Sequence, residues 1–192
     1  KITNFGSLSE LETIGKNAFK NSALTEATLP DGLKQIGHSA FSGSHISSIN
    51  LPANVVLELV SGSIKIDGST HHGENQYYKL ISPFTDCSEL ESITVEEGSK
   101  YSVSDSCLLD ANNHILVIPE GIEDVVIPNG ASFLDELDGE NKSLIAFFER
   151  NSQMRSIDLS KSGITELPTG LFYGCTELRT IILKNTTTVI GD

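Results

Sequence analysis

The sequence predicts an α/β repeat fold, a solenoid with short parallel strands on a concave sheet and short helical or 3₁₀ turns on the convex side. The first observation is a phrase written twice, LETIGKNAFKNSALTEATLP at 11–30 and LKQIGHSAFSGSHISSINLP at 33–52, with apolar positions at a constant offset of 22. The second is a strand pattern, L-x-x-I-x-L, found in six copies. A fixed period in the twenties with variable polar positions is typical of solenoids.

Each copy of the strand pattern places apolar residues at alternate positions, as expected for a strand with one buried face. The copies begin at Leu24, Ile46, Leu90, Ile122, Met154 and Leu178. Pro30, Pro52 and Pro128 follow three of the copies, where the missing backbone N–H can end a strand. We therefore expect six parallel strands stacked about 4.8 Å apart.

Between the strands, the phrases IGKNAF and QIGHSAF favour short helical turns. They place an isoleucine and an Ala-Phe pair about one and a half helical turns apart. Phenylalanines at corresponding positions then predict an aromatic ladder beneath the convex surface, which we assign to the core. Its members are Phe19, Phe41, Phe84, Phe148 and Phe172.

The spacing of the strand copies predicts one solenoid domain over residues 1–192 with three insertions. Successive copies start 22, 44, 32, 32 and 24 residues apart, so the longer intervals contain extra segments. These lie near 55–83, 104–119 and 132–150. Insertions in a solenoid map to loops on its faces.

Each insertion has its own pattern. The first contains VVLELVSGSIKID, which we interpret either as a hairpin turning at 61–63 or as a degenerate repeat, with an exposed loop at 68–76. The second, SDSCLLDANNHILVIP, predicts a β-hairpin that turns at 110–113. The third has helical spacing broken by Gly139, which predicts two short helices or a helix and a loop.

Charge and hydropathy exclude several classes of partner. Thirteen basic residues against twenty-six acidic ones give a net charge of -13, which disfavours nucleic acid and anionic membrane surfaces. No apolar run approaches the roughly 18 residues needed to cross a bilayer, so we expect no membrane insertion of this segment. The chain begins at Lys1, and Val189–Gly191 restarts the TIG phrase, so we interpret it as a fragment of a longer protein.

Three cysteines are an odd number, which rules out a complete set of internal disulfides. Cys87 and Cys175 occupy one repeat position, three residues after a phenylalanine. We expect small buried thiols there. A bridge between Cys87 and Cys107 is the alternative that the sequence leaves open.

The repeated phrases resemble the BspA-type leucine-rich repeat, whose pattern joins an I-G-x-x-A-F turn, an optional F-x-x-C and an L-x-x-I-x-L-P strand. SCLLDANNHILVIPEGIEDVVIPNG is also similar to the hairpin found between repeats of that family. The match is strongest over 11–52 and extends over 84–130 and 164–192. The resemblance implies a right-handed, open leucine-rich-repeat solenoid on an exported bacterial surface protein, often described as adhesive. It supplies no catalytic residue.

A search for chemistry yields no convincing site. His71-His72-Gly73-Glu74 carries metal-ligand types, but adjacent residues cannot easily converge on one ion, and we expect a loop. Asp110, Asn112 and His114 begin like a calcium loop that lacks its glycine and its closing glutamate, which predicts a turn. No phosphate-binding or nucleophile motif occurs. We expect no enzyme activity, metal or cofactor.

The strand pattern itself offers a candidate binding surface. Side chains that alternate outward would form a polar, hydroxyl-rich and mildly acidic concave face, and concave repeat surfaces are large binding sites by geometry. The residues selected as ligand-binding are Glu26, Thr28, Ser48, Asn50, Ser92, Thr94, Asp124, Ser156, Asp158 and Thr180. Val126 and Ile182 occupy the remaining outward positions of the last three strands.

The leading functional hypothesis is a non-enzymatic protein-binding and adhesion module, located outside the cell or at its surface. A lipid anchor on a segment outside this sequence is one arrangement for such a module. The first rival is a carbohydrate-binding surface, which normally needs exposed aromatic platforms; Tyr77, Tyr78 and Tyr101 are the candidates. A structural spacer without a ligand is the second rival.

Overall fold

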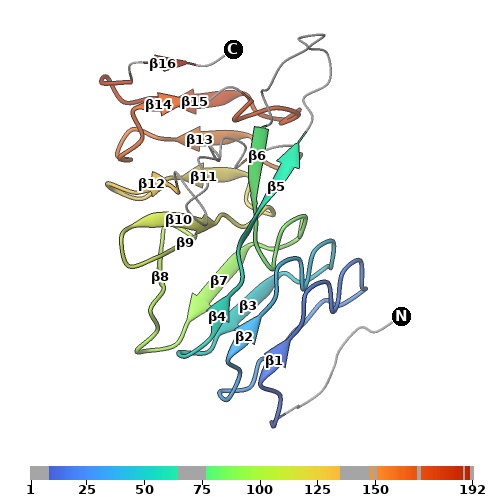
Figure 1. Cartoon of the computed structure of the whole chain (residues 1–192). Coiled ribbons are helices and arrows are strands. Elements are labelled where there is room, and N and C mark those ends of the chain that lie inside the picture. The colour runs from blue at the N-terminus through green and yellow to red at the C-terminus, as the bar shows by residue number, and fades with distance from the viewer. Residues whose placement is uncertain are drawn as a thin grey trace.

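The computed structural model describes residues 9–64, 77–134, 148, 151–167, 170–187 and 189–190. The strands lie on successive levels, with the N-terminal ones at one end and the C-terminal ones at the other (Figure 1). Within the described ranges the regular structure is entirely β, with open sheets and no helix. That part of the chain accordingly contains no helix that could cross a membrane.

The predicted strands pair in parallel, as expected, but in two separate sheets. β3 (Ser48–Leu51) pairs with β7 (Ser92–Val95). β11 (Asp124–Val126), β13 (Ser156–Asp158) and β15 (Thr180–Ile182) form the second sheet. We call these two sheets the first ladder.

The prediction of six stacked strands is met at five positions. Residues 24–29 form no regular strand, and Ala27, a poor strand former, stands where the other copies have isoleucine or valine. The two sheets are separated in sequence by the inserted segment that follows β7, and a bond from the Gly121 amide to the Leu90 carbonyl (2.7 Å) connects their flanks. The continuous ladder is therefore interrupted at the insertion.

A second set of parallel strands was not predicted. β1 (Thr13–Ile14), β2 (Gln35–Ile36) and β4 (Val56–Leu57) pair side by side, and β14 (Glu166–Leu167) pairs with β16 (Val189–Ile190). We call these pairs the second ladder. β1 and β2 form where the IG phrases had suggested the start of a helical turn, because Ile14 and Ile36, each before a glycine, are buried from an extended backbone.

The expected helical or 3₁₀ turns on the convex side are instead chains of tight turns. The amides of Ala18 and Lys20 donate three residues back within the turn, whereas those of Asn17, Phe19 and Asn21 donate to carbonyls of the next coil. Asn17 and Asn21 also have φ of 57° and 55°. A helix needs every amide for its own ladder and negative φ throughout, so it cannot form here.

The phenylalanine ladder is confirmed in two runs. Ring centroids are 5.4 Å apart between Phe19 and Phe41 and 5.8 Å apart between Phe41 and Phe84. Phe148 and Phe172 stack at 5.5 Å. Such spacing is typical of offset-stacked rings, which add to the free energy gained by burial alone. The aromatic residues are therefore structural, as the sequence predicted.

The hairpin predicted at 104–119 is also confirmed. β9 (Cys107–Leu109) and β10 (His114–Val117) pair antiparallel, with the turn between them, and β8 (Ser102–Ser104) adds a further antiparallel strand to β9. On its other side, β10 pairs in parallel with β12 (Ser132–Phe133). The insertion thus belongs to a four-stranded sheet of its own, in the order β12-β10-β9-β8.

The other insertions differ from their predictions or lie outside the described residues. β5 (Val60–Ile64) pairs antiparallel with β6 (Tyr77–Ile81), and this hairpin runs along the stack in Figure 1. Residues 61–63 therefore lie within a strand, so the predicted turn there is wrong. The degenerate repeat is met only at β4, which pairs in parallel with β2, because β5 leaves the parallel stack. The loop expected at 68–76 and most of the helical segment at 132–150 fall outside the described ranges.

Two hydrophobic cores lie on either side of the hairpin. The N-terminal core contains Leu108 and Leu116, together with inward residues of both ladders such as Ile14 and Ile49. The C-terminal core contains Cys107, Leu109 and Ile115. Successive side chains of a strand point to opposite faces, so β9 and β10 contribute to both cores. This is why all of β9 is buried even though it is an insertion.

Candidate binding surface

The outward side chains of the first ladder form the outward strand face. In β3 the pattern is exposed, buried, exposed, buried, because Ile49 and Leu51 enter the core and leave Ser48 and Asn50 outside. All the selected residues are exposed except Ser156 and Asp158, which are partly buried. The inward and outward assignment made from the sequence is therefore confirmed at these positions. Whether they bind a ligand stays a prediction.

In the N-terminal sheet, the selected residues form two cross-strand pairs. Ser48 lies opposite Ser92, and Asn50 lies opposite Thr94. The Thr94 hydroxyl donates to the Asn50 Oδ1 at 2.8 Å, and the Asn50 amide donates to Glu96 Oε1 at 3.4 Å. These bonds fix the side chains of a small, uncharged polar surface with an acidic margin.

In the C-terminal sheet, the outward side chains form two rows of three, and four of these six residues are selected ones. Asp124, Ser156 and Thr180 are in register, and the Ser156 hydroxyl donates to Asp124 Oδ1 at 2.6 Å. The second row has Asp158 between Val126 and Ile182. Val126 and Ile182 are 41% and 47% exposed, which makes this sheet more apolar than the N-terminal one.

The carboxylate of Asp158 is held in place by its own chain. Its Oδ1 accepts a hydrogen bond from the Ser160 amide at 2.8 Å. Hydrogen bonds from Ser160 are the main cause that lowers the pKa of Asp158, and Lys161 adds a smaller contribution. The centre of the second row is therefore a fixed negative charge at neutral pH.

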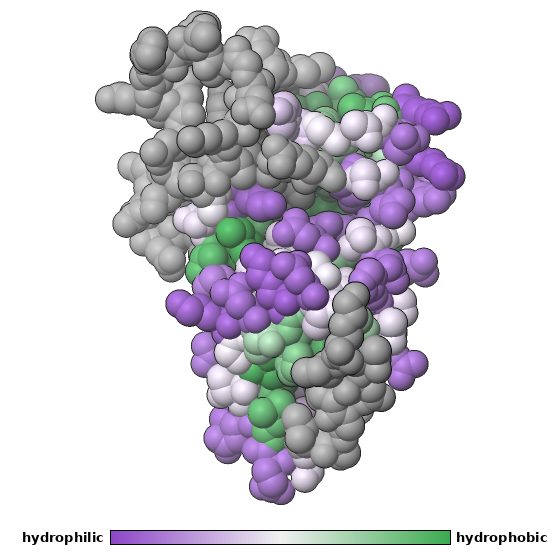
Figure 2. All heavy atoms as spheres, turned by 90° about the vertical axis from the view of Figure 1, so that its right-hand side faces the viewer, coloured by the Kyte–Doolittle hydropathy of each residue, from purple (hydrophilic) through white to green (hydrophobic). Residues whose placement is uncertain are grey.

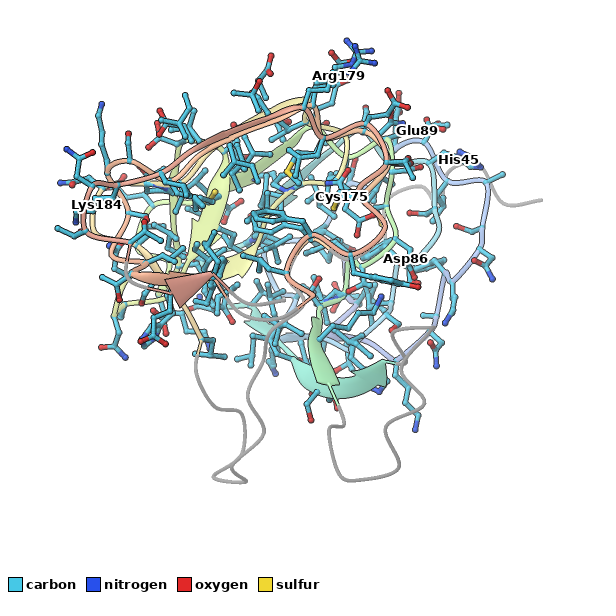
Figure 3. All side chains as sticks on the ribbon, turned by 90° about the horizontal axis from the view of Figure 1, so that it is seen from above. His45, Asp86, Glu89, Cys175, Arg179 and Lys184 are labelled. Atoms are coloured by element: carbon cyan, nitrogen blue, oxygen red, sulfur yellow. The ribbon has the colours of Figure 1, made fainter. Side chains whose placement is uncertain are left out.

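Charged pairs border the C-terminal sheet. Arg155 Nη1 lies 2.7 Å from Glu123 Oε2, across two neighbouring strands, and Arg179 Nη2 lies 3.3 Å from Glu177 Oε2. Figure 3 shows Arg179 pointing away from the body of the molecule. Sequence reasoning missed the Glu123–Arg155 pair, although its 32-residue separation equals the offset between the two strand copies.

Two selected residues are not brought into a paired ladder. Glu26 and Thr28 are exposed, but they belong to the segment that forms no regular strand. They therefore flank the N-terminal sheet instead of extending it in register. The surface supported by strand pairing consists of the eight other selected residues, with Val126 and Ile182 beside them.

The turn side of the molecule, seen in Figure 2, offers a less continuous surface. Hydrophobic side chains are visible there in patches separated by hydrophilic ones. Phe19 and Phe172, at the ends of the two aromatic runs, are only partly buried, whereas Phe41 and Phe148 are 0% and 2% exposed. Their contacts are with the core, which supports a structural role for this side.

The remaining candidates for chemistry are structural where they are described. Asp110 Oδ1 accepts bonds from the amides of Asn112 and His114 at 2.9 and 2.8 Å, so this carboxylate closes the hairpin turn as predicted. Burial acts to raise the pKa of Asp110, but hydrogen bonds from His114 outweigh it, so the pKa of this carboxyl group is lowered. Among the described residues, no group of three or more His, Cys, Asp or Glu side chains could hold a metal ion. His71 and His72 lie outside those residues.

The aromatic platforms suggested for a glycan are not supported by Tyr101. It is buried, and its hydroxyl accepts a hydrogen bond from the Leu57 amide at 3.0 Å. The side chains of Tyr77 and Tyr78 are outside what the structure describes. A carbohydrate surface therefore gains no support from the aromatic residue whose position is known.

All three cysteines are free, so the alternative Cys87–Cys107 bridge is absent. Cys87 and Cys107 are buried, and burial raises the pKa of each thiol to about 12. Cys175 is partly buried, and burial raises its pKa to about 11. Thiols with such pKa values are poor nucleophiles at neutral pH, as expected of core residues.

Two solved structures share the fold of the chain. A leucine-rich cell surface protein from Faecalibacterium prausnitzii matches 90% of this chain with 20% identity and a TM-score of 0.55. The pneumococcal vaccine antigen PcpA matches 93% with 21% identity and a TM-score of 0.58. The chain spans only 39% and 38% of those two chains. No curated protein sequence matches it.

A family model identifies the repeats directly. The model of the BspA type leucine rich repeat region matches in six copies, over residues 1–58 and 144–192. These ranges contain the twice-written phrase and the strand copies that form β13 and β15. Repeats of this kind generally serve as non-enzymatic scaffolds that bind proteins. The chain belongs to the BspA-type leucine-rich repeat family.

Proposed function

We propose that the chain is a protein-binding and adhesion module of an exported bacterial cell-surface protein, and that it has no catalytic role. In this proposal residues 1–192 form one right-handed solenoid domain, and the outward strand face is its concave, ligand-binding surface. The Faecalibacterium protein of similar fold is a leucine-rich cell surface protein, which supports the location. An anchor would belong to a segment outside this sequence.

The observation that carries the proposal is the register of exposed polar side chains across neighbouring strands. Ser48 and Asn50 lie opposite Ser92 and Thr94, and hydrogen bonds hold the second pair in fixed positions. Side chains that are already ordered lose less conformational entropy on binding. A stable protein partner covers about 800 Å² on each side. Two ladder sheets offer a surface of this scale more readily than a single loop does.

Charge favours protein partners over other classes. The net charge of -13 repels phosphate backbones, and the selected residues add only Glu26, Asp124 and Asp158 to the face itself. The outward strand face is therefore polar and mildly acidic. A spacer without a ligand would need no such ordered surface, and a glycan surface would need exposed aromatic side chains.

Surface capture with matched variants tests the proposal. The immobilised chain is exposed to host and bacterial surface proteins, and a captured partner is then titrated against Asn50→Arg/Thr94→Arg. These cations should weaken binding sharply, because they intrude into the contact. The control is His71→Ala/His72→Ala, which should leave binding unchanged. Loss of binding in the histidine variant, or on addition of a chelator, would show that the binding site is not the strand face.

A further inference from the structure

The three-stranded sheet of β11, β13 and β15 differs from the rest of the outward strand face. Its second row reads apolar, acidic, apolar, as Val126, Asp158 and Ile182 in strict register. Val126 and Ile182 are among the few large hydrophobic side chains that are well exposed in the described part of the chain. The N-terminal sheet has only hydroxyl and amide groups at its paired outward positions.

The row sets the spacing that a partner must match. Neighbouring strands lie about 4.8 Å apart, so the row covers about 9.6 Å with a carboxylate at its centre. On an α-helix, residues i, i+4 and i+7 lie on one side and span about 10.5 Å at 1.5 Å per residue. An extended segment presents same-face residues every 6.6 Å or so, and three of them span about 13 Å. The helix fits the row and the extended segment does not.

Charge determines the central residue of the partner. Asp158 Oδ1 accepts the Ser160 amide at 2.8 Å, so Ser160 orients the carboxylate at the centre of the row. The nearby Arg155 is engaged by Glu123 at 2.7 Å, outside the row. A lysine or arginine of the partner would complement the Asp158 carboxylate, and apolar residues on either side would cover Val126 and Ile182.

We infer that this sheet binds an amphipathic protein helix lying across β11, β13 and β15, whose contact stripe reads apolar, basic, apolar at i, i+4 and i+7. The inference rests on the proposed function and specifies its partner. A helix about 10 Å wide also reaches the first row, where Asp124, Ser156 and Thr180 accept polar groups from its flank. The Ser156 hydroxyl donates to Asp124 Oδ1 at 2.6 Å and so orients this exposed carboxylate beside the row.

Synthetic peptides supply the probe. The test peptide is an acetylated, alanine-rich 18-mer of about five helical turns that carries Leu, Lys and Leu at i, i+4 and i+7. One control replaces the lysine by glutamate, and another places proline at the centre to break the helix. Anisotropy of a fluorescent label should show binding of the lysine peptide, at least about tenfold weaker binding of the glutamate peptide, and no binding of the proline peptide.

Protein variants locate the contact. Asp158→Asn keeps the acceptor for the Ser160 amide, so the turn is preserved while the charge is lost, and Ile182→Ser removes an exposed apolar group. Each substitution should weaken binding of the lysine peptide by about fivefold or more. Val56→Ser, which removes a comparably exposed apolar group from β4 of the second ladder, should have no effect. Equal binding of all three peptides, no binding of the lysine peptide, or full binding by Asp158→Asn would overturn the inference.

The capture experiment separates this inference from the proposed function. If a captured partner is weakened by Asn50→Arg/Thr94→Arg while the helical peptide fails to bind, the strand face remains the site and only the helix is wrong. If a captured partner binds the variants on both sheets as tightly as it binds the wild type, the proposed function itself is wrong. A partner that loses binding in Asp158→Asn and competes with the lysine peptide supports both.

Discussion

The thiol sulfur of Cys87 lies 3.1 Å from the carbonyl oxygen of Phe41 in the preceding coil. The relation recurs at the other end of the chain, where Cys175 Sγ lies 2.8 Å from the carbonyl oxygen of Phe148. In both coils the same carbonyl also accepts the amide three residues further on. The thiol therefore uses the second lone pair of a turn carbonyl and joins two coils, which explains a cysteine three residues after a phenylalanine.

Thiol reactivity should follow this burial. At pH 8 an aromatic disulfide reagent such as Ellman's should modify Cys87 and Cys107 only after denaturation, because burial raises the pKa of both to about 12 and excludes the reagent. Cys175, which is partly exposed, should react slowly in the native protein. Rapid modification of two or more thiols under native conditions would show that the repeat cores are open.

Phe41 should be among the most important residues for stability. It is fully buried and stacks on Phe19 and Phe84, so Phe41→Ala should lower the free energy of unfolding by about 3–5 kcal/mol. Asn50→Ala, on the exposed face of the neighbouring strand, should cost less than about 1 kcal/mol. Chemical denaturation measures both, and similar losses would mean that the inward and outward faces are reversed.

Gly121 should resist substitution because of its backbone neighbours. A Cβ built there would lie 2.7 Å from the Leu90 carbonyl oxygen, the same atom that accepts the Gly121 amide bond. Gly121→Ala should therefore destabilise by about 1–3 kcal/mol, since the backbone must shift. Gly15 is the matched control because a Cβ there meets nothing within 4 Å, so Gly15→Ala should be neutral or slightly stabilising. Equal thermal midpoints for the two variants would argue against close contact at Gly121.

The free energy of unfolding should decrease between about pH 4.5 and 7 because of the ionisation of Glu120. Its carboxylate accepts the Asp86 amide at 2.8 Å, and burial raises its pKa from 4.5 to about 7. The folded chain therefore holds the proton of the Glu120 carboxyl group more tightly than the unfolded chain does. The stabilisation that this gives is fully present below the unfolded pKa of Glu120 and is lost as pH rises through the folded pKa. Glu120→Gln keeps an acceptor and cannot ionise, so the difference in unfolding free energy between wild type and variant should change across this interval. A difference that stays constant with pH would contradict the assignment.

The sequence was informative where one residue type recurs in one environment. The inward Ile49 and Ile157 and the ring of Phe41 are buried at recurring positions, so their period was visible and their burial was predicted correctly. Ile181, at the corresponding position of β15, was also predicted to be inward but is 41% exposed. The hairpin at 110–113 was also predictable, because Asp110 and Asn113 suit a tight turn, and Asn113 adopts φ of 67°.

Features that depend on partners distant in the chain were not visible. Thr13–Ile14 is too short to show alternation, and it becomes a strand only because Gln35–Ile36 lies beside it. Val60–Ile64 pairs with Tyr77–Ile81 across a long interval, so the local Ser-Gly-Ser signal suggested the wrong turn. On the candidate surface, the outward positions were found, but the pairing of Arg155 with Glu123 depends on the order in which the coils stack.

The placement of the β9–β10 hairpin has a consequence for how the molecule unfolds. In a linear array of repeats, cooperativity depends on the interface energy between neighbours, and a weak junction lets the two ends melt separately. Here Leu108 and Leu109, adjacent in sequence, belong to different cores. Loss of either core removes the contacts that one face of the hairpin makes, and so weakens the packing of the other core. The insertion that interrupts the repeat pattern therefore couples the two halves, and heating should melt them in a single transition.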